Sequence, residues 1–164
     1  MTRRQILLAG TGALALFGVV RLMSYRSAVT TSDVFETMHS DAEWRRLLTP
    51  AQYAVLREHG TERPYSSPLN SEKQSGVFAC AGCGLPLFSS EAKYDSGTGW
   101  PSFWRPLDNA IGTTNDSTFG MGRTEVHCRR CGGHLGHVFD DGPRPTGLRY
   151  CINGVAMTFA PPAA

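Results

Sequence analysis

Cys80-Ala81-Gly82-Cys83-Gly84 and Cys128-Arg129-Arg130-Cys131-Gly132 are two units of one kind, each with two residues between its cysteines and a glycine directly after them. Glycine lets the backbone turn back so that its N–H groups approach the thiolates, which is the form of a zinc knuckle. Four thiolates complete a tetrahedral Zn²⁺ site with no open position, so the site would be structural. The sequence therefore predicts a Zn²⁺ ion that joins two distant hairpins. Its ligands would be Cys80, Cys83, Cys128 and Cys131.

Short segments around these units have the character of β-strands. They are rich in β-branched and aromatic residues, and clusters of Gly, Pro, Asn and Asp separate them. The segments are 77–80, 85–88, 123–128, 137–139, 148–152 and 157–159. The many glycines and prolines also favour a turn-rich β fold over a helical bundle.

Two short helices are predicted before the strands. Ser40 and Glu43 have the spacing of a capping box at the start of the first helix. Pro50 stands at the first position of the second, where a missing N–H costs nothing, and Gly60 is a plausible end signal. The residues expected to face inward are Trp44, Leu47, Leu48, Tyr53, Val55 and Leu56.

The first residues differ in character from the rest of the 164-residue chain. Arg3 and Arg4 precede an apolar, uncharged run from Ile6 to Val20, which fits an export signal and resembles one of the twin-arginine type. No clean cleavage site follows, so the segment could remain as a membrane anchor. We expect residues 1–28 to be an export signal or anchor, 29–39 a linker and 40–162 the domain. The expected location is periplasmic, or cytoplasmic if the signal does not function.

The net charge bears on whether a nucleic-acid partner is expected, and the export signal bears on the state of the paired cysteines. A net charge of +2, with 41% apolar and 18% charged residues, gives no broad basic field, so no nucleic-acid partner is expected. In an oxidising periplasm the cysteine pairs could form disulfides, and one unit could instead be a redox pair. Twin-arginine export weakens the first alternative, because the metal could be loaded in the cytoplasm before transport.

Cys151 is left over once the four paired cysteines are assigned. Most lone cysteines are small buried hydrophobes, but an odd cysteine in an exported protein needs a chemical explanation. Arg149 lies two residues before it, on the same face of a strand, and a nearby guanidinium lowers the pKa of a thiol. Asn153 lies two residues after it and can orient a water molecule or a substrate oxygen. We therefore expect Cys151 to be a candidate nucleophile.

Two further clusters are candidates for chemistry. His134 and His137 are either a surface pair or acid catalysts for a reaction in which an oxygen takes up protons near neutral pH. Trp100, Phe103 and Trp104 follow a glycine-rich loop. Aromatic residues usually pack in a core, but a box of them carried by a loop could hold a methyl or thioether group.

Together these clusters resemble the methionine-R-sulfoxide reductase B family in its zinc-containing form. The specific blocks are Gly-Trp-Pro-Ser-Phe at 99–103, His-Leu-Gly-His-Val-Phe-Asp-Asp-Gly at 134–142 and Arg-Tyr-Cys-Ile-Asn at 149–153. Segments 44–50 and 60–64 also match, and all of them run in family order. The resemblance implies a mainly β fold of two antiparallel sheets, of the Mss4-like or β-tent type, with short N-terminal helices.

The resemblance also implies the roles of the site residues. Cys151 would attack the substrate sulfur, and His137, helped by His134, would donate a proton or hold water at the sulfoxide oxygen. Asn153 and Arg149 would position and polarise the site. Trp100 would pack on the substrate methyl group, with Phe103 beside it in the aromatic box. The enzyme would reduce methionine-R-sulfoxide in peptides or proteins through a cysteine sulfenic acid, which repairs oxidised proteins.

One departure from the family bears on the reductant. Many members carry a second, resolving cysteine where this chain has Thr98. A thioredoxin-like protein or a small thiol would then have to reduce the sulfenic acid directly. Gly154 stands where a serine is common in the family, and we expect this difference to have a small effect on the site.

A non-catalytic zinc-binding interaction module is the alternative function, but it leaves Cys151, the histidines and the Gly-Trp-Pro loop unexplained. A C-x-x-C disulfide oxidoreductase is a further alternative. The substrate's size, the reductant, signal cleavage and oligomeric state stay open.

Overall fold

A computed structural model describes residues 35–117 and 122–162. The predicted export signal at 1–28, and with it the predicted membrane attachment, lies outside the described residues, as does most of the predicted linker. The described residues belong to one compact unit. Within the described ranges, no helix has the length and apolar character needed to cross a membrane.

Both predicted helices form, and both begin with a capping box. Helix α1 spans Asp41–Leu47, and its N-cap Ser40 exchanges hydrogen bonds with Glu43. Helix α2 spans Pro50–Leu56, and Thr49 and Gln52 pair in the same way at its start. Trp44 and Leu48 are buried, but Leu47 is 59% exposed, which corrects the prediction that it faces inward. The helix ends at Leu47 and Leu48 is extended, so the change in backbone direction turns only Leu48 toward the core.

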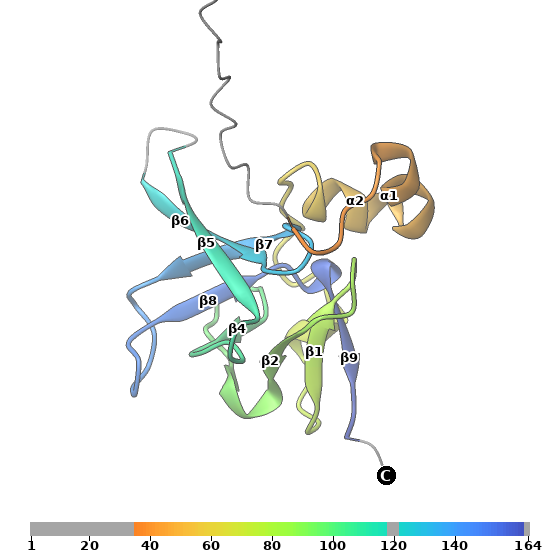
Figure 1. The fold of residues 1–164 in the computed structure, drawn as a ribbon. Helices are drawn as coiled ribbons and strands as arrows, with labels where there is room; N and C mark the ends of the chain where they lie inside the picture. Colours follow the sequence, from red (N-terminus) through yellow and green to blue (C-terminus); the bar gives the residue numbers. More distant parts are fainter. Residues whose placement is uncertain (1–34, 118–121, 163–164) are drawn as a thin grey trace, which may run out of the picture. The chain divides into compact units, whose positions relative to one another are not determined.

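The strands form two antiparallel sheets, as predicted (Figure 1). The smaller sheet has the order β2-β1-β9. Its strands are β1 (Val77–Cys80), β2 (Pro86–Ser89) and β9 (Met157–Ala160). The larger sheet has the order β3-β4-β8-β7-β6-β5. Its strands are β3 (Lys93–Tyr94), β4 (Ser102–Phe103), β5 (Ile111–Asp116), β6 (Arg123–Cys128), β7 (His134–Phe139) and β8 (Arg149–Ile152). The sequence did not predict β3, β4 or β5. Short 3₁₀ helices occur at Pro68–Asn70 (η1), Ser90–Ala92 (η2) and Gly154–Ala156 (η4).

Aromatic rings join the two sheets. Phe78 on β1 and Phe88 on β2 meet Phe103 on β4, and all three are fully buried. Phe88 stacks on Phe103 with ring centroids 4.3 Å apart, and Phe78 meets Phe103 edge-on at 5.1 Å. Such pairs contribute about 0.5–1.5 kcal/mol each beyond the burial of their area. The core therefore fixes the small sheet against β4, which is a neighbour of β8 in the larger sheet.

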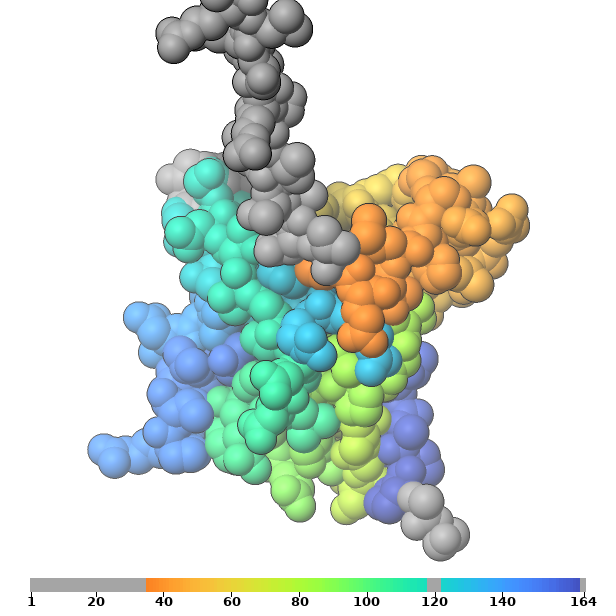
Figure 2. Space-filling model, in the orientation of Figure 1, coloured from red at the N-terminus to blue at the C-terminus, as the bar shows by residue number. Residues whose placement is uncertain are grey.

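The described end of the predicted linker packs on the domain. The Phe35 ring meets the His127 ring edge-on at 5.8 Å, and the Thr37 N–H donates to the Arg130 carbonyl at 2.9 Å. In Figure 2 the orange surface that begins at residue 35 lies against the surface of the segment around residue 130. Phe35 and Thr37 are therefore in contact with β6 and with the turn that follows it.

Candidate active site

The four paired cysteines meet at one point between the two sheets. Cys80 ends β1, Cys128 ends β6, and the second cysteine of each unit lies in the turn that follows its strand. The Sγ atoms of Cys80 and Cys131 are 3.7 Å apart, and those of Cys83 and Cys128 are 3.5 Å apart. A tetrahedral zinc ion with four bonds of about 2.3 Å places its sulfurs about 3.8 Å from one another. The cluster therefore has the dimensions of a four-thiolate metal site.

The local backbone and the electrostatics fit the same conclusion. Gly84 and Gly132 have φ values of +70° and +66°, and each N–H donates to the carbonyl of the first cysteine of its unit. A side chain would strain this conformation. Hydrogen bonds from Cys128, Cys131 and Cys83, together with burial, raise the pKa of the Cys80 thiol. The four sulfurs cannot all ionise side by side unless a cation compensates their charge. The residues present therefore fit a bound metal cation.

Cys151 lies in a second site, on the larger sheet. The register of β7 and β8 places Cys151 directly opposite His137, and β4 places Ser102 on its other side. A cavity of about 150 Å³ opens here. Its lining residues are Thr61, Trp100, Arg123, Gly136, His137, Phe139, Cys151 and Asn153. The structure thus gathers a thiol, an imidazole, an amide and an indole around one small space.

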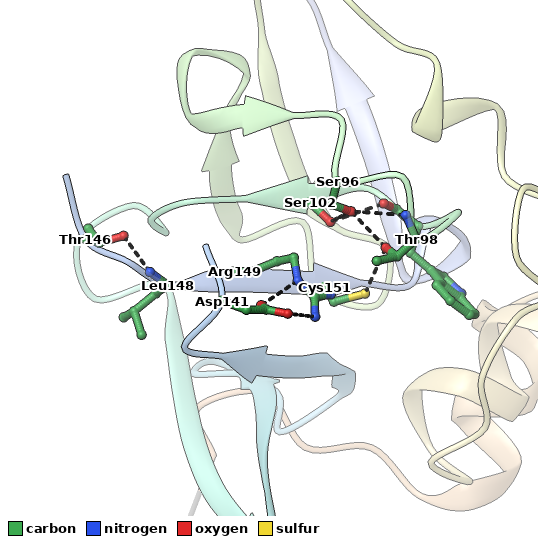
Figure 3. Close-up of polar contacts among 9 residues, drawn as sticks. Ser96, Thr98, Ser102, Asp141, Thr146, Leu148, Arg149 and Cys151 are labelled. Carbon is green, nitrogen blue, oxygen red and sulfur yellow. Dashed lines mark hydrogen bonds and ion pairs between the residues drawn. The ribbon is translucent and has the colours of Figure 1, made fainter. Parts of the chain in front are cut away.

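The surroundings of Cys151 change the expectation for its thiol (Figure 3). Burial raises the pKa of Cys151, and the Thr98 hydroxyl and the Arg149 guanidinium offset that shift only in part. Thr98 Oγ1 lies 3.9 Å from Cys151 Sγ. Arg149 donates from both Nε and an Nη atom to the two carboxylate oxygens of Asp141, each at 2.8 Å. Because burial outweighs the guanidinium, and the Asp141 carboxylate adds a smaller effect in the same direction as burial, the pKa of the thiol is raised and not lowered as predicted.

Carboxylates from β5 and β6 fix the two histidines. The Nδ1–H of His134 donates to Glu125 at 2.7 Å, and the Nε2–H of His137 donates to Asp116 at 2.9 Å. Burial is the main cause that lowers the pKa of His134. Only His137 lines the small cavity with Cys151. His134 does not line this cavity, and its ring centroid lies 5.4 Å from that of His137.

Glu62 ties the loop before η1 to the residues around the cavity. Its carboxylate accepts the N–H groups of Gly154 at 2.6 Å and Val155 at 2.9 Å. Its backbone carbonyl accepts the Trp100 indole N–H at 3.2 Å, and its N–H donates to the Asn153 side-chain oxygen at 3.0 Å. Asn153 also donates from its amide to the Leu135 carbonyl at 2.9 Å. One residue thus sets the positions of both Trp100 and Asn153.

Phe103 does not lie at the cavity, in contrast to its predicted place beside Trp100. Its ring is fully buried and packs between Phe78 and Phe88. Side chains alternate across a strand, and in β4 Ser102 takes the position beside Cys151 while Phe103 pairs with Tyr150. Phe103 is therefore a core residue, and the substrate-contacting role expected for it has no support.

Much of this sequence is shared with known proteins. A family model for the SelR domain matches residues 48–161. The chain is 58% identical over 123 residues to the peptide methionine sulfoxide reductase MsrB of Agrobacterium fabrum, an alignment that covers 74% of this chain and 91% of that protein. The identity to the MsrB of Leptospira interrogans is 52% over 126 residues, which covers 76% and 96% of the two chains.

The chain belongs to the MsrB family. The matched region contains both cysteine units and every residue that lines the Cys151 cavity. Among solved structures, the Yippee-like domain of Mis18 aligns with a TM-score of 0.45 at 19% identity, over 56% of this chain and all of that domain.

Sequence reasoning missed several residues of this MsrB site. Glu62 lies in a segment that matched the family, but no functional role was assigned to it. Glu125 and Asp116 were missed because only the strand register brings them to the histidines. His59 was also missed, because only the fold brings its ring to 5.1 Å from that of His134. The sequence signal for Glu125 was its place in a predicted strand shortly before Cys128.

Proposed function

We propose that this MsrB chain reduces methionine-R-sulfoxide, bound in peptides or proteins, back to methionine and so repairs oxidised proteins. The observation that carries the proposal is the pairing of Cys151 with His137 across β8 and β7, at a cavity that Trp100 and Asn153 also line. A nucleophile and an acid at one small cavity match the needs of a reaction at a sulfoxide, where sulfur is attacked and oxygen takes up a proton.

The reaction balances with the residues at the cavity. Cys151 loses its proton and attacks the substrate sulfur, while His137 supplies a proton to the sulfoxide oxygen, a poor leaving group until it is protonated. A bond forms between Cys151 Sγ and the substrate sulfur, and the oxygen, which also takes up the thiol proton, leaves as water when the S–O bond breaks. Water then attacks Cys151 Sγ, the S–S bond breaks with its electron pair going to the methionine sulfur, and one proton returns to His137. Methionine leaves, and Cys151 is a sulfenic acid. The sulfoxide is reduced by two electrons and the cysteine is oxidised by two. His134, held by Glu125, orients His137 across the short distance between their rings.

The other residues near the cavity would select the sulfoxide epimer, hold the shape of the cavity and support the thiolate. The Trp100 ring would pack on the substrate methyl group, and its fixed position would favour one sulfoxide epimer. The amide of Asn153 is engaged on both sides, so we assign it to holding the shape of the cavity. Arg149 would support the thiolate through its charge, as far as Asp141 permits.

The sulfenic acid must be reduced from outside the described part of the chain. In this proposal Zn²⁺ occupies the site of Cys80, Cys83, Cys128 and Cys131 and has a structural role only. A thioredoxin-like protein or a small thiol then supplies two thiols, which form a disulfide and release the oxygen as water. We further propose a periplasmic location, with residues 1–28 as a twin-arginine signal that is either cleaved or kept as an anchor.

The test uses the separate R and S epimers of a methionine sulfoxide peptide with dithiothreitol as reductant. The purified full chain and its Cys151→Ser variant run side by side. Reduction of the R epimer alone, and by the parent alone, supports the proposal. If a folded, metal-loaded protein reduces neither epimer, the non-catalytic zinc-binding module takes its place.

A further inference from the structure

A second group of metal-type ligands lies beside the active site. Among the described residues, His59, Glu125 and His134 bring one ligand atom each to within 4.8 Å of one another. His59 Nδ1 lies 3.1 Å from Glu125 Oε1, and His134 Nδ1 lies 2.7 Å from the same oxygen. These residues come from the end of the helical layer, from β6 and from β7, so the fold itself assembles the cluster.

The spacing suits a first-row divalent cation. Bonds of about 2.0–2.1 Å in a tetrahedral site place neighbouring ligand atoms about 3.3 Å apart. The distance of 3.1 Å between His59 and Glu125 is near that value, and the distance of 2.7 Å between His134 and Glu125 is shorter. Small movements would complete the fit, and His59 can make them because its side chain is 65% exposed and it lies outside the helices and strands, directly after the turn at 57–58.

The chemistry of the donor set points to the same class of ion. Two imidazoles and a carboxylate are the usual protein ligands of a zinc site that keeps one position open. His134 and Glu125 are 3% and 13% exposed, so they offer a preformed, desolvated pair. Burial also lowers the pKa of His134, which favours the neutral imidazole that a metal binds.

There is room for the remaining ligand. A cavity of about 460 Å³ adjoins the cluster, and Thr61, Asn115, Asp116 and His137 contribute to its wall. Water or an anion could fill the open position there. The ion would lie apart from the four-cysteine site, with different donors and an open side.

We propose that His59, Glu125 and His134 form a second site, which binds one exchangeable divalent cation of the zinc class. When the cation binds, it displaces the proton on His134 Nδ1 to the solvent, and the carboxylate of Glu125 coordinates it. The consequence for catalysis rests on the proposed function. His134 could no longer orient His137 as it does now, so the metal-bound protein would reduce sulfoxide more slowly.

The experiment measures binding without turnover. The purified full chain, with zinc already in its cysteine site, is dialysed to equilibrium against Co²⁺, and bound cobalt is counted per chain. The visible spectrum identifies the ligands, because cysteine ligation adds intense thiolate-to-cobalt charge-transfer bands. We expect about one Co²⁺ per chain in addition to the zinc, without those bands.

Matched variants locate the ion. Both His59→Ala and Glu125→Gln are expected to weaken Co²⁺ binding by at least about tenfold. His39→Ala is the control, because His39 is also an exposed histidine of the N-terminal segment but lies against Trp44. Absence of an added cobalt, or equal binding by parent and His59→Ala, overturns the proposal, whatever the reductase assay shows. Loss in His39→Ala alone overturns it too, because the ion would then lie elsewhere.

Discussion

Thr98 Oγ1 lies 3.9 Å from Cys151 Sγ, in the glycine-rich loop that leads to Trp100. Gly97 and Gly99 flank Thr98 with φ values of +71° and +94°. The glycines allow the loop to carry a small side chain toward the nucleophile. Under the proposed function, Thr98 offers no sulfur that could resolve the sulfenic acid, so an external thiol would have to reduce it.

Thr98→Cys is expected to create an internal resolving step. A cysteine sulfur in place of Oγ1 would begin within about 2 Å of the 2.05 Å disulfide bond length, and the loop can close the gap. After one equivalent of substrate and no reductant, mass spectrometry should show loss of two hydrogens in the variant. The parent should instead carry a sulfenic acid that dimedone labels. Thr98→Ser is the control, and dimedone labelling of the Thr98→Cys variant at the parent's level would contradict the prediction.

Arg149→Met is expected to slow alkylation of Cys151 at pH 7 several-fold. Burial already raises the pKa of this thiol, and the guanidinium is one of the groups that opposes the shift. Its loss leaves less thiolate at any pH below the pKa, so the alkylation rate profile should move to higher pH. Iodoacetamide labelling followed by peptide mapping across a pH series measures this. The exposed Arg105→Met serves as the control, and an unchanged profile for Arg149→Met would refute the electrostatic account.

Removal of the metal from the four-cysteine site is expected to unfold the domain. The site joins the β1–β2 turn to the β6–β7 turn, and structural zinc contributes on the order of 10 kcal/mol to small metal-dependent folds. Cys131→Ser, or a strong chelator, should abolish the cooperative thermal transition seen by circular dichroism. Cys151→Ser should keep the parent's transition and its metal content. If the protein still melts cooperatively near the parent's temperature after chelation, the hydrophobic core alone is enough to keep the domain folded.

Glu62→Gln is expected to weaken substrate binding more than the chemical step. The amide can keep only one of the two acceptor oxygens that now hold Gly154 and Val155, and such charged hydrogen bonds contribute about 1.5–3 kcal/mol each. The backbone groups of residue 62 that hold Trp100 and Asn153 would remain, but the loop that carries them would be held less firmly on Gly154 and Val155. KM should therefore rise while the alkylation rate of Cys151 stays unchanged. The control is the exposed Glu91→Gln. An effect on kcat alone would contradict a positioning role.

The features that the sequence predicted correctly are those coded by local spacing. The two cysteine units and the Ser40–Glu43 capping box are written in neighbouring residues, and each appears as expected. The second capping box, between Thr49 and Gln52, was not predicted. Strand β5 was missed because its exposed, polar sequence Ile-Gly-Thr-Thr-Asn-Asp has no apolar alternation. It is a strand because β6 offers it a hydrogen-bonding edge.

The site shows the same division between local and long-range information. The family blocks place Cys151, His137, Trp100 and Asn153, and the structure brings all four to one cavity. The spacing of the Gly-Trp-Pro-Ser-Phe block could not show which ring turns inward, so Phe103 was misplaced. The partners of the histidines depend on pairing between distant strands, which no short segment encodes.

The four-cysteine cluster gives this protein a weakness of its own. Under the proposed function it works where oxidants are present, and its fold depends on sulfur atoms that the same oxidants attack. Cys80, Cys128 and Cys131 are shielded by the core, but Cys83 is partly exposed. Oxidative damage would therefore start at Cys83 and end in loss of the metal. The lifetime of the repair enzyme under oxidative stress would then depend on one sulfur that takes no part in the repair.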